Sequence, residues 1–180
     1  MTVSKTLRIA PAVAVLGAAI SGAVGVPAAH ADNKRLNESV VVNVYTVQHK
    51  NGCDTEIAIN PKLRLAAQWH TNDLLNNRAL DGDIGSDGST VADRARNAGY
   101  DGTVAQTVAI NPALAISGIE LINRWYHRPD YYAIMSDCSN IDIGVWSENL
   151  IDRSVVVAVY GKGDFGAPVQ APIRDFGQPG

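Results

Sequence analysis

Residues 85–100 have the sequence GSDGSTVADRARNAGY. Thr90 is suited to cap a helix, and Asp93, three residues later, can return a hydrogen bond to the backbone of Thr90, which is the capping-box pattern. Gly99 follows as a residue that commonly ends helices. This stretch therefore predicts a polar turn that leads into a short helix, which begins at Thr90 and stops before Gly99.

Two Asn-Pro pairs predict further helices, because Asn caps a helix and Pro fits the first helical position. The pair at Asn60 begins the clearest helix, which ends near residue 77 and has an apolar stripe at three- and four-residue steps: Leu63, Ala66, Ala67, His70 and Leu74. The pair at Asn111 predicts a third helix, which Pro129 ends and whose stripe is Leu114, Gly118, Leu121, Ile122 and Trp125. A short helical turn is expected over residues 131–135.

Two β-strands are predicted late in the chain. Residues 141–146 (IDIGVW) and 154–160 (SVVVAVY) are rich in β-branched and aromatic side chains, and a polar connection joins them. Residues 40–48 (VVVNVYTVQ) are ambiguous, because their composition favours a strand whereas Val41, Val44, Tyr45 and Gln48 also fit a helical stripe. Helices followed by neighbouring strands predict a layered α+β domain.

Residues 1–31 have the features of an export signal. Lys5 and Arg8 form a positive start, residues 9–26 contain no charge, and the Ala-His-Ala at residues 29–31 has small residues where a signal peptidase cleaves. A permanent membrane helix is disfavoured, because Gly and Pro interrupt the stretch and about 18 apolar residues are at the low end for spanning a bilayer. We therefore predict a protein that begins at Asp32 and is secreted, either extracellular or associated with the cell wall.

The charge and composition exclude several classes of protein. The net charge of −3 becomes −5 over the 149 residues that remain after the predicted cleavage, and a chain this acidic has no electrostatic reason to bind nucleic acid or an anionic membrane. The apolar fraction of 46% fits a globular domain and not a disordered chain. We expect one domain over residues 32–161, no nucleic-acid partner and no transmembrane segment after cleavage.

Cys53 and Cys138 are the only two cysteines of the chain. Export would bring both to an oxidising compartment, where one disulfide is the simplest expectation. No CxxC pattern or neighbouring histidine supports the alternatives of a metal pair or a reactive thiol. The two residues are 85 positions apart, and a loop of that size corresponds to about 4–5 kcal/mol in the chain-entropy model.

The segment after Tyr160 contains Gly161-x-Gly163-x-x-Gly166, which matches the dinucleotide-binding fingerprint letter by letter. That site also needs a helix whose N-terminus receives the pyrophosphate. The sequence that follows is rich in Gly and Pro and cannot supply this helix, so the match is interpreted as accidental. Residues 162–180 are predicted to form a flexible tail.

The loop from Asp81 to Asp87 has acidic residues at alternate positions, as calcium-binding loops do. The EF-hand pattern requires Asp or Asn where Gly85 stands and Glu where Ala92 stands. A solvated turn is therefore the simpler interpretation, and cation binding by this loop stays open.

Three histidines remain after the predicted cleavage: His49, His70 and His127. His70 lies on the apolar stripe of its helix, so a hydrogen-bonded core residue is expected there and not a ligand or a base. His127 lies at the end of the predicted third helix, where a positive charge is favourable. The chain has no HExxH or GxSxG motif, so the residues alone do not support catalysis.

The order of these segments resembles the CAP superfamily, which comprises cysteine-rich secretory proteins, antigen 5 and pathogenesis-related proteins. The resemblance depends on residues 60–78, 85–100, 124–135 and 141–146, and DGST…DR is its most specific part. The likeness is greatest to small exported bacterial members of the mycobacterial type. It implies an α-β-α sandwich, with helices on both faces of a small, mainly antiparallel sheet. It also implies that residues 40–48 form the first helix.

The resemblance implies a cavity whose polar residues have changed in this chain. Family members have a ring of two histidines and two acidic residues, which binds a divalent metal in several of them. By position, Asp83 replaces the histidine of FSHT, Gln106 replaces the glutamate of GENIA, and Tyr131 replaces the histidine of SPGHR. Because Gln is a poor ligand and Tyr stays protonated, one carboxylate without an imidazole does not make a zinc site. We expect no metal, no cofactor and no catalytic residue here.

This loss of the polar tetrad favours a secreted, non-enzymatic CAP-like domain at the cell envelope or outside the cell. A lipid, another apolar ligand, or a cell-surface or host component is the expected partner. Four aromatic residues are candidates for an apolar contact surface, of which the first and the last are expected in the core: Trp125, Tyr131, Tyr132 and Trp146. Two alternatives stay open: a hydrolase with a remodelled site around Asp83 and Gln106, and a divalent-metal-binding domain that uses the loop from Asp81 to Asp87.

Overall fold

The computed structural model describes residues 30–80 and 82–164 of the chain. The predicted export signal up to residue 29, Asp81, and residues 165–180 of the predicted tail lie outside the described residues, and so does Gly166 of the glycine motif. Within the described ranges, no helix is both long enough and apolar enough to cross a membrane.

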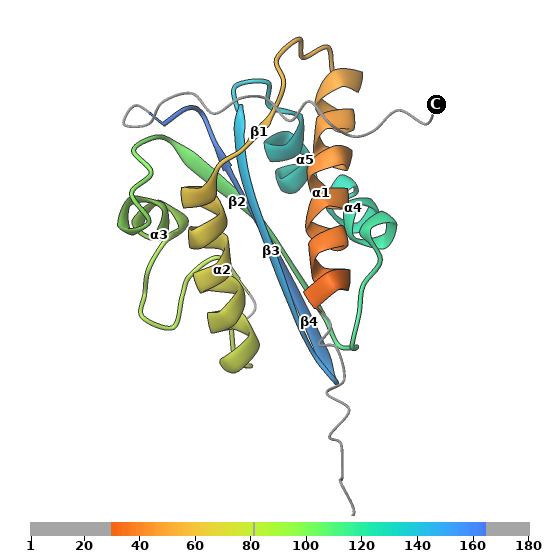
Figure 1. The fold of residues 1–180 in the computed structure, drawn as a ribbon, viewed down its shortest axis with the longest axis vertical. Helices are drawn as coiled ribbons and strands as arrows, with labels where there is room; N and C mark the ends of the chain where they lie inside the picture. Colours follow the sequence, from red (N-terminus) through yellow and green to blue (C-terminus); the bar gives the residue numbers. More distant parts are fainter. Residues whose placement is uncertain (1–29, 81, 165–180) are drawn as a thin grey trace, which may run out of the picture.

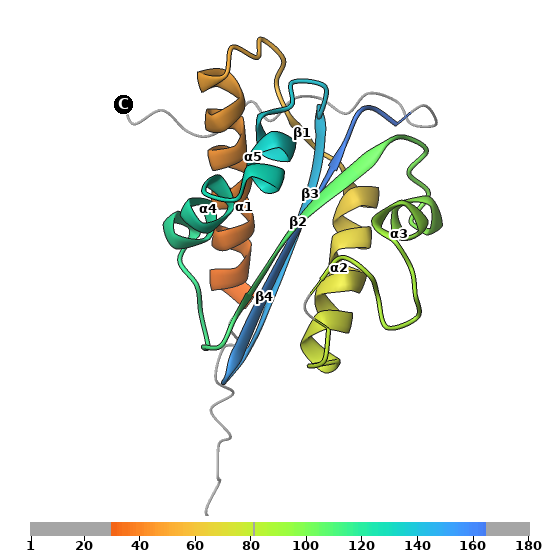
Figure 2. The same ribbon diagram turned by 180° about the vertical axis from the view of Figure 1, so that it is seen from behind.

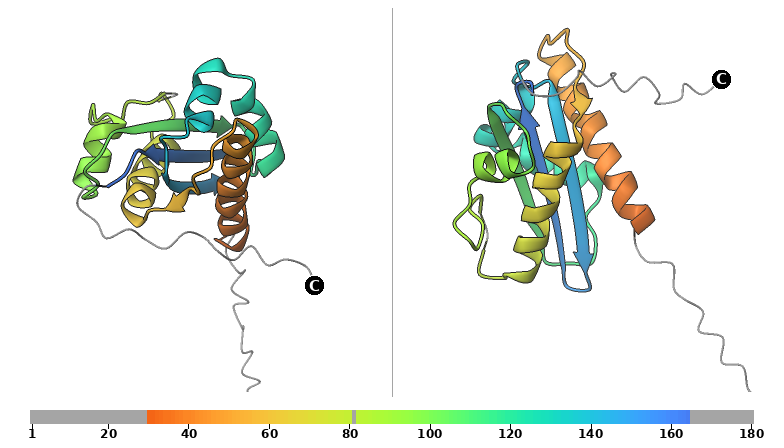
Figure 3. Two further views of the ribbon diagram at one scale, coloured as in Figure 1. Left: turned by 90° about the horizontal axis from the view of Figure 1, so that it is seen from above. Right: turned by 60° about the vertical axis from the view of Figure 1, so that its left-hand side comes forward.

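A sheet lies between two layers of helices (Figures 1 and 2). One face is covered by α1 (His30–Lys50), α4 (Gly118–Tyr126) and α5 (Pro129–Ser136), and the other by α2 (Pro61–Asn76) and α3 (Val91–Asn97). The strands are β1 (Ala58–Ile59), β2 (Val104–Asn111), β3 (Asp142–Leu150) and β4 (Arg153–Gly161). The view along the layers in Figure 3 shows the strands enclosed on both sides. The structure is thus an α-β-α sandwich, as the resemblance implied.

The strand order is β1-β3-β4-β2. β3 and β4 form an antiparallel hairpin, β2 pairs antiparallel with β4, and only the two-residue β1 is parallel to its neighbour β3. The mainly antiparallel sheet is therefore confirmed. β2 is an edge strand, and this edge borders the candidate site.

β4 is buried after its first residue, Arg153, because both of its faces meet a helical layer. Successive side chains of a strand point to opposite faces, and those of residues 155, 157 and 159 pack with α2 and α3. Those of residues 156, 158 and 160 pack with α1, α4 and α5. All six are completely shielded from solvent, which explains why SVVVAVY is apolar without interruption.

Residues 40–48 are helical, so the preference that their composition gave to a strand is wrong. Val40, Val41, Val44 and Val47 lie on one face of α1 and are buried in the core. Gln48 extends this face and donates from Nε2 to the carbonyl oxygen of Asn140 (2.9 Å). The apolar stripe of a whole helix contributes more here than the modest β-propensity of valine.

The two predicted helix starts at Asn60 and Thr90 are confirmed. Asn60 Oδ1 accepts from the backbone N–H of Lys62 (3.0 Å), with Pro61 as the first residue of α2. Thr90 and Asp93 form the complete capping box at the start of α3. Local side-chain chemistry therefore determines both starts.

The start predicted for the third helix at Asn111-Pro112 is wrong, whereas its later part is α4, where Leu121 and Trp125 of the predicted stripe are buried. Asn111 is the last residue of β2, and α4 begins only at Gly118, where Ser117 Oγ accepts from the N–H of Glu120 (3.1 Å). Leu114, predicted to be part of the buried stripe, is 56% exposed. The side chain of Asn111 instead donates to the carbonyl oxygen of Ala115 (2.9 Å) and so closes the connecting loop.

The predicted disulfide between Cys53 and Cys138 is present, with 5.2 Å between the two Cα atoms. It joins the loop after α1 to the loop between α5 and β3. The first residues of the predicted tail are also held to the domain, since the N–H of Lys162 donates to Thr103 and that of Gly163 to the Tyr100 hydroxyl.

Candidate functional site

Two of the three predicted cavity positions are in contact. Gln106 is buried on β2, and Asp83 is exposed in the loop between α2 and α3. Gln106 Nε2 donates to the Asp83 carboxylate (3.1 Å to Oδ1) and also lies 3.2 Å from its backbone carbonyl oxygen. The structure thus brings these two residues together across 23 positions of sequence.

Arg94 organises this contact, and the sequence interpretation did not single it out. Its side chain extends from α3 and is only 5% exposed. Nη2 donates to Gln106 Oε1 (2.9 Å) and to the Asp83 carbonyl oxygen (2.9 Å), while Nη1 donates to the Ser89 carbonyl oxygen (2.6 Å). Desolvation by burial lowers the pKa of Arg94. The only signal in the sequence was its place beside Asp93, inside the most specific segment of the resemblance.

These hydrogen bonds fix the orientation of the Gln106 amide. A guanidinium group has donors and no acceptor, so only the carbonyl oxygen of the amide can face Arg94. The amide nitrogen must then face Asp83, as observed. The side-chain oxygen Oε1, the atom of this amide that could bind a cation, therefore already accepts a hydrogen bond from the Arg94 guanidinium group.

Tyr131 lies on α5 and is buried. Its ring is covered by the Arg128 guanidinium, 3.6 Å from the ring centroid, and meets the edge of Trp125, with 6.3 Å between the ring centroids. Burial, with a smaller contribution from the charge of Asp83, raises the pKa of Tyr131. The phenol therefore stays protonated and does not act as an anionic ligand at neutral pH.

The acidic loop does not gather its carboxylates. Asp83 accepts from Gln106, whereas Asp87 Oδ1 accepts from the N–H of Ser89 (2.9 Å) within its own turn. Asp73 of α2 supports the loop from outside and accepts from the N–H of Ser86 (2.7 Å). In the described part of the chain, which lacks Asp81, no three His, Cys, Asp or Glu residues are close enough together to hold a metal ion. The residues present therefore do not fit the metal that the family resemblance implies.

His70 is a buried core residue, as expected. Nε2 lies 3.1 Å from the Gly82 carbonyl oxygen, which assigns the ring proton to Nε2 because a carbonyl oxygen only accepts. Burial lowers the pKa of His70, so the ring is neutral at neutral pH. It supports the loop that contains Asp83 and does not face solvent.

The four aromatic candidates do not form one contact surface. Trp125 is buried in the core that contains α1, α4 and α5, and Trp146 is half-buried and packs against the core on the opposite face of the sheet. Arg64 covers the Trp146 ring at 4.8 Å, and the hydroxyl of Tyr132 donates to Asn51 (2.9 Å). The prediction of a shared apolar surface is wrong because Trp125 and the two tyrosines lie in the layer of α4 and α5, whereas Trp146 of β3 packs on the opposite face of the sheet.

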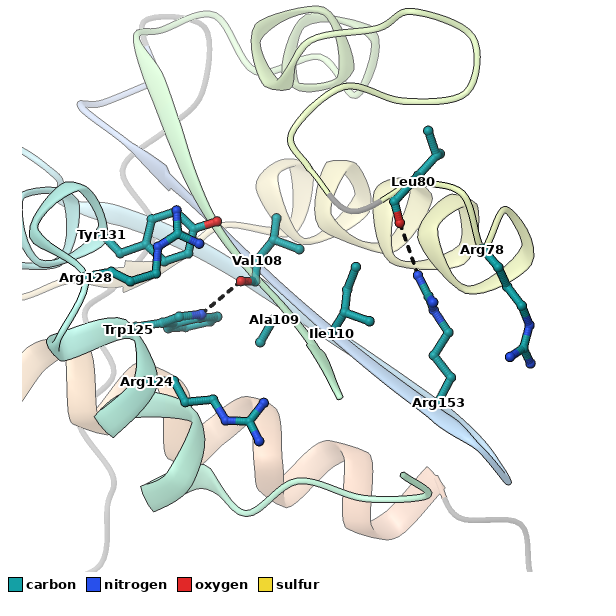
Figure 4. A pocket seen from close by; sticks show the side chains of 10 residues that line it. All are labelled: Arg78, Leu80, Val108, Ala109, Ile110, Arg124, Trp125, Arg128, Tyr131 and Arg153. Carbon is teal, nitrogen blue, oxygen red and sulfur yellow. Dashed lines mark hydrogen bonds between the residues drawn. The ribbon is translucent and has the colours of Figure 1, made fainter. Parts of the chain in front are cut away.

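A pocket of about 330 Å³ lies beside Tyr131, along the edge strand β2 (Figure 4). Val108, Ala109 and Ile110 of β2 form its apolar floor, and Trp125 closes one side. Trp125 Nε1 donates to the Val108 carbonyl oxygen (3.1 Å), so the indole presents no free donor. The polar side chains of the lining are Tyr131 and four arginines.

The fold is similar to that of three surface or extracellular bacterial proteins. An outer surface protein from Borrelia burgdorferi has a TM-score of 0.62 and 16% identity, over 72% of this chain and 93% of that chain. An extracellular protein with an SCP domain from Bacillus anthracis strain Ames has a TM-score of 0.61 and 11% identity, over 73% and 41%. A cysteine-rich secretory protein from Staphylococcus aureus Mu50 has a TM-score of 0.53 and 14% identity, over 73% and 39%.

This chain spans about two-fifths of the Bacillus and Staphylococcus proteins. No protein-family model and no curated protein sequence matches it. At these identities the likeness shows the fold alone, and the fold is that of SCP or CAP domains.

Proposed function

We propose that the chain is a secreted, non-enzymatic CAP-like domain that binds a ligand or a partner at the cell envelope or outside the cell. The observation that supports this most directly is the Gln106 amide, which is held between Arg94 and Asp83. A buried amide whose oxygen accepts from a guanidinium group and whose nitrogen donates to a carboxylate is a poor metal ligand and has no titratable proton to transfer. The disulfide and the extracellular proteins of the same fold support the place of action.

The same proposal includes an export signal over residues 1–31 and a domain over residues 32–161. It also includes kinship with the small exported CAP-superfamily proteins of the mycobacterial type. N-terminal sequencing of protein recovered from the culture medium of the native host should give Asp32 as the first residue. Recovery of the chain with residues 1–31 attached to membranes would contradict this part of the proposal.

A hydrolase is the weaker alternative. A serine or cysteine nucleophile needs a base within hydrogen-bond reach, and no hydrogen bond of the described residues joins a histidine to a hydroxyl or thiol. His70 is committed to a backbone carbonyl and buried. His49 is exposed and stacks on Tyr45, with 4.1 Å between the ring centroids. Neither His70 nor His49 is therefore poised to activate a nucleophile.

The test is a zinc and calcium titration of the purified mature protein by calorimetry, together with an assay on p-nitrophenyl esters. We expect no micromolar metal binding and no turnover above the buffer rate. The matched comparison is the double variant Gln106→Glu/Tyr131→His, which adds a carboxylate and an imidazole to the site and should gain zinc affinity. Micromolar binding by the wild type that Asp83→Ala removes would establish the metal-binding alternative instead, and ester turnover would establish the hydrolase.

A lipid or another apolar molecule is the class of ligand that we propose, in line with the apolar floor of the pocket beside β2. Its volume of about 330 Å³ is at the lower end for ligand pockets, so it fits a headgroup or a small body and not a whole two-chain lipid. Mass spectrometry of small molecules that co-purify from the native host tests this directly. A preparation that contains no such molecule and takes up none would contradict the proposed ligand class.

A further inference from the structure

Four arginines surround the pocket along β2, and among the residues that the structure describes, which do not include Asp81, no acidic side chain lines it. They come from three separate places: Arg78 follows α2, Arg124 and Arg128 lie in and just after α4, and Arg153 begins β4. Figure 4 shows these side chains around the apolar floor, with Arg124 and Arg128 on the side of α4 and Arg78 and Arg153 on the side of the β3–β4 hairpin. The chain as a whole is acidic, yet this pocket has a positive wall.

Three of these arginines form ion pairs with carboxylates that do not line the pocket: Arg78 with Asp152, Arg124 with Glu120, and Arg128 with Asp130. Their side chains are between 41% and 55% exposed. Exposed ion pairs of this kind contribute little to stability. An anion in the pocket can therefore recruit these arginines at small cost.

Arg153 differs from the other three because no carboxylate is paired with it among the described residues. Nη2 donates to the Leu80 carbonyl oxygen (3.2 Å), whereas Nε is buried and has no acceptor in the described part of the chain. A buried guanidinium N–H without an acceptor is unfavourable. Arg153 is thus the one arginine of the four whose charge has no carboxylate partner among the described residues.

We propose that this pocket binds a phosphomonoester whose phosphate oxygens face the arginines and whose organic part lies on Val108 and Ile110. A phosphate group has three terminal oxygens and close to two negative charges at neutral pH, which suits guanidinium groups that converge from several sides. A carboxylate has two oxygens and one charge and leaves more of these donors unused.

The phosphomonoester can be a soluble molecule or the headgroup of a lipid such as phosphatidic acid. This inference rests on the proposed role in binding and names its ligand class. The size of the pocket, about 330 Å³, admits the phosphate and a compact body in both cases, so binding experiments must separate the two sources.

The test is a calorimetric titration of the mature protein with inorganic phosphate and with phenyl phosphate. We expect phenyl phosphate to bind more tightly, because its ring contacts the floor, and we expect affinity to fall as salt rises. Arg153→Gln and Arg128→Gln should each weaken phenyl phosphate binding at least tenfold. Arg96→Gln is the matched control. Arg96 is an exposed arginine of α3, on the other side of the sheet from α4, and among the described residues its ion pair is with Asp93. Its loss should leave the affinity for phenyl phosphate unchanged.

Sedimentation with phosphatidylcholine vesicles, with and without phosphatidic acid, identifies the source. If the protein sediments only with vesicles that contain phosphatidic acid, and phenyl phosphate abolishes this, the ligand is a lipid headgroup. If phenyl phosphate binds in calorimetry but the protein does not sediment with the vesicles, the ligand is a soluble phosphomonoester. Absence of binding in both experiments, or binding that Arg128→Gln and Arg153→Gln leave unchanged, would overturn the proposal. Because Arg128 is exposed, its variant stays informative even if Arg153→Gln fails to fold. Hydrolysis of phenyl phosphate during the titration would refute the non-enzymatic function but not the phosphate site.

Discussion

Reduction of the Cys53–Cys138 disulfide is expected to lower the stability of the domain strongly without changing its folded structure. Hydrogen bonds that do not need the covalent bond also join the two loops that it connects. Gln48 Nε2 reaches Asn140, and the Thr55 hydroxyl donates to the carbonyl oxygen of Cys138 (3.4 Å). Reduction therefore acts mainly on the unfolded chain, which gains freedom.

The magnitude follows from the length of the closed loop. A sequence separation of 85 gives an entropy change of about 15 cal/mol/K in the chain-entropy model, which is about 4.5 kcal/mol at 25 °C. Domains of this size have a free energy of unfolding of about 5–15 kcal/mol. The disulfide is thus expected to contribute a large share of the total.

Urea unfolding of the oxidised and the reduced protein, followed by far-UV circular dichroism, measures this difference. The two samples have the same sequence, so no cavity or new side chain complicates the comparison. With a denaturant slope of about 2 kcal/mol per molar, the midpoint should fall by roughly 2 M. A fall that corresponds to less than about 1 kcal/mol, at an unchanged slope, would refute the argument from loop closure.

Three further outcomes are expected. Gly144→Ala should lower the free energy of unfolding in urea by about 3 kcal/mol or more, because a Cβ there would lie 2.0 Å from the backbone nitrogen of Arg64. Gly82→Ala is the control: a Cβ at Gly82 meets nothing within 4 Å, so the free energy of unfolding should change little. Hydrogen bonds from Ser139 and Lys162 lower the pKa of Asp137 from 3.8 to about 2, so this carboxylate stabilises the fold above about pH 4, and the gain is lost towards pH 2. The difference in the free energy of unfolding between the wild type and Asp137→Asn should therefore shrink as the pH falls over that range. A difference that stays constant would contradict this role of Asp137. Thr90→Ala removes the cap of α3 and should cost about 1 kcal/mol in thermal unfolding; no change would show that the cap is not needed.

The parts of the fold that depend on local chemistry were predictable from the sequence. Asn60 and Thr90 each cap a helix with their own side chains, and these starts are correct. Asn111-Pro112 has the same letters as Asn60-Pro61, yet Asn111 is the last residue of a strand. β2 pairs with β4 about fifty residues later, and nothing within VAQTVAIN shows that partner. Local signals cannot distinguish the two Asn-Pro pairs, because long-range pairing decides between them.

The candidate site was predictable as positions but not as chemistry. Asp83 and Gln106 do meet, although the sequence could not show that Arg94 would donate to both of them. The pocket is a stronger case of the same limit. Its arginines lie at positions 78, 124, 128 and 153, far apart in sequence and diluted by acidic residues. The net charge of −5 for the whole domain does not reveal this cluster of arginines, because a sum over the chain carries no information on position.

The complete burial of β4 has a consequence for how the molecule opens. Its backbone pairs with β3 on one side and with β2 on the other, while both helical layers cover its side chains. Exchange of a β4 amide proton therefore needs an opening that separates a neighbouring strand from β4 and also moves a helical layer, so these amides are expected among the slowest of the domain. The exchange rate of β4 amides thus reports large openings of the domain, and the loop around Asp83 can open many times between two such events.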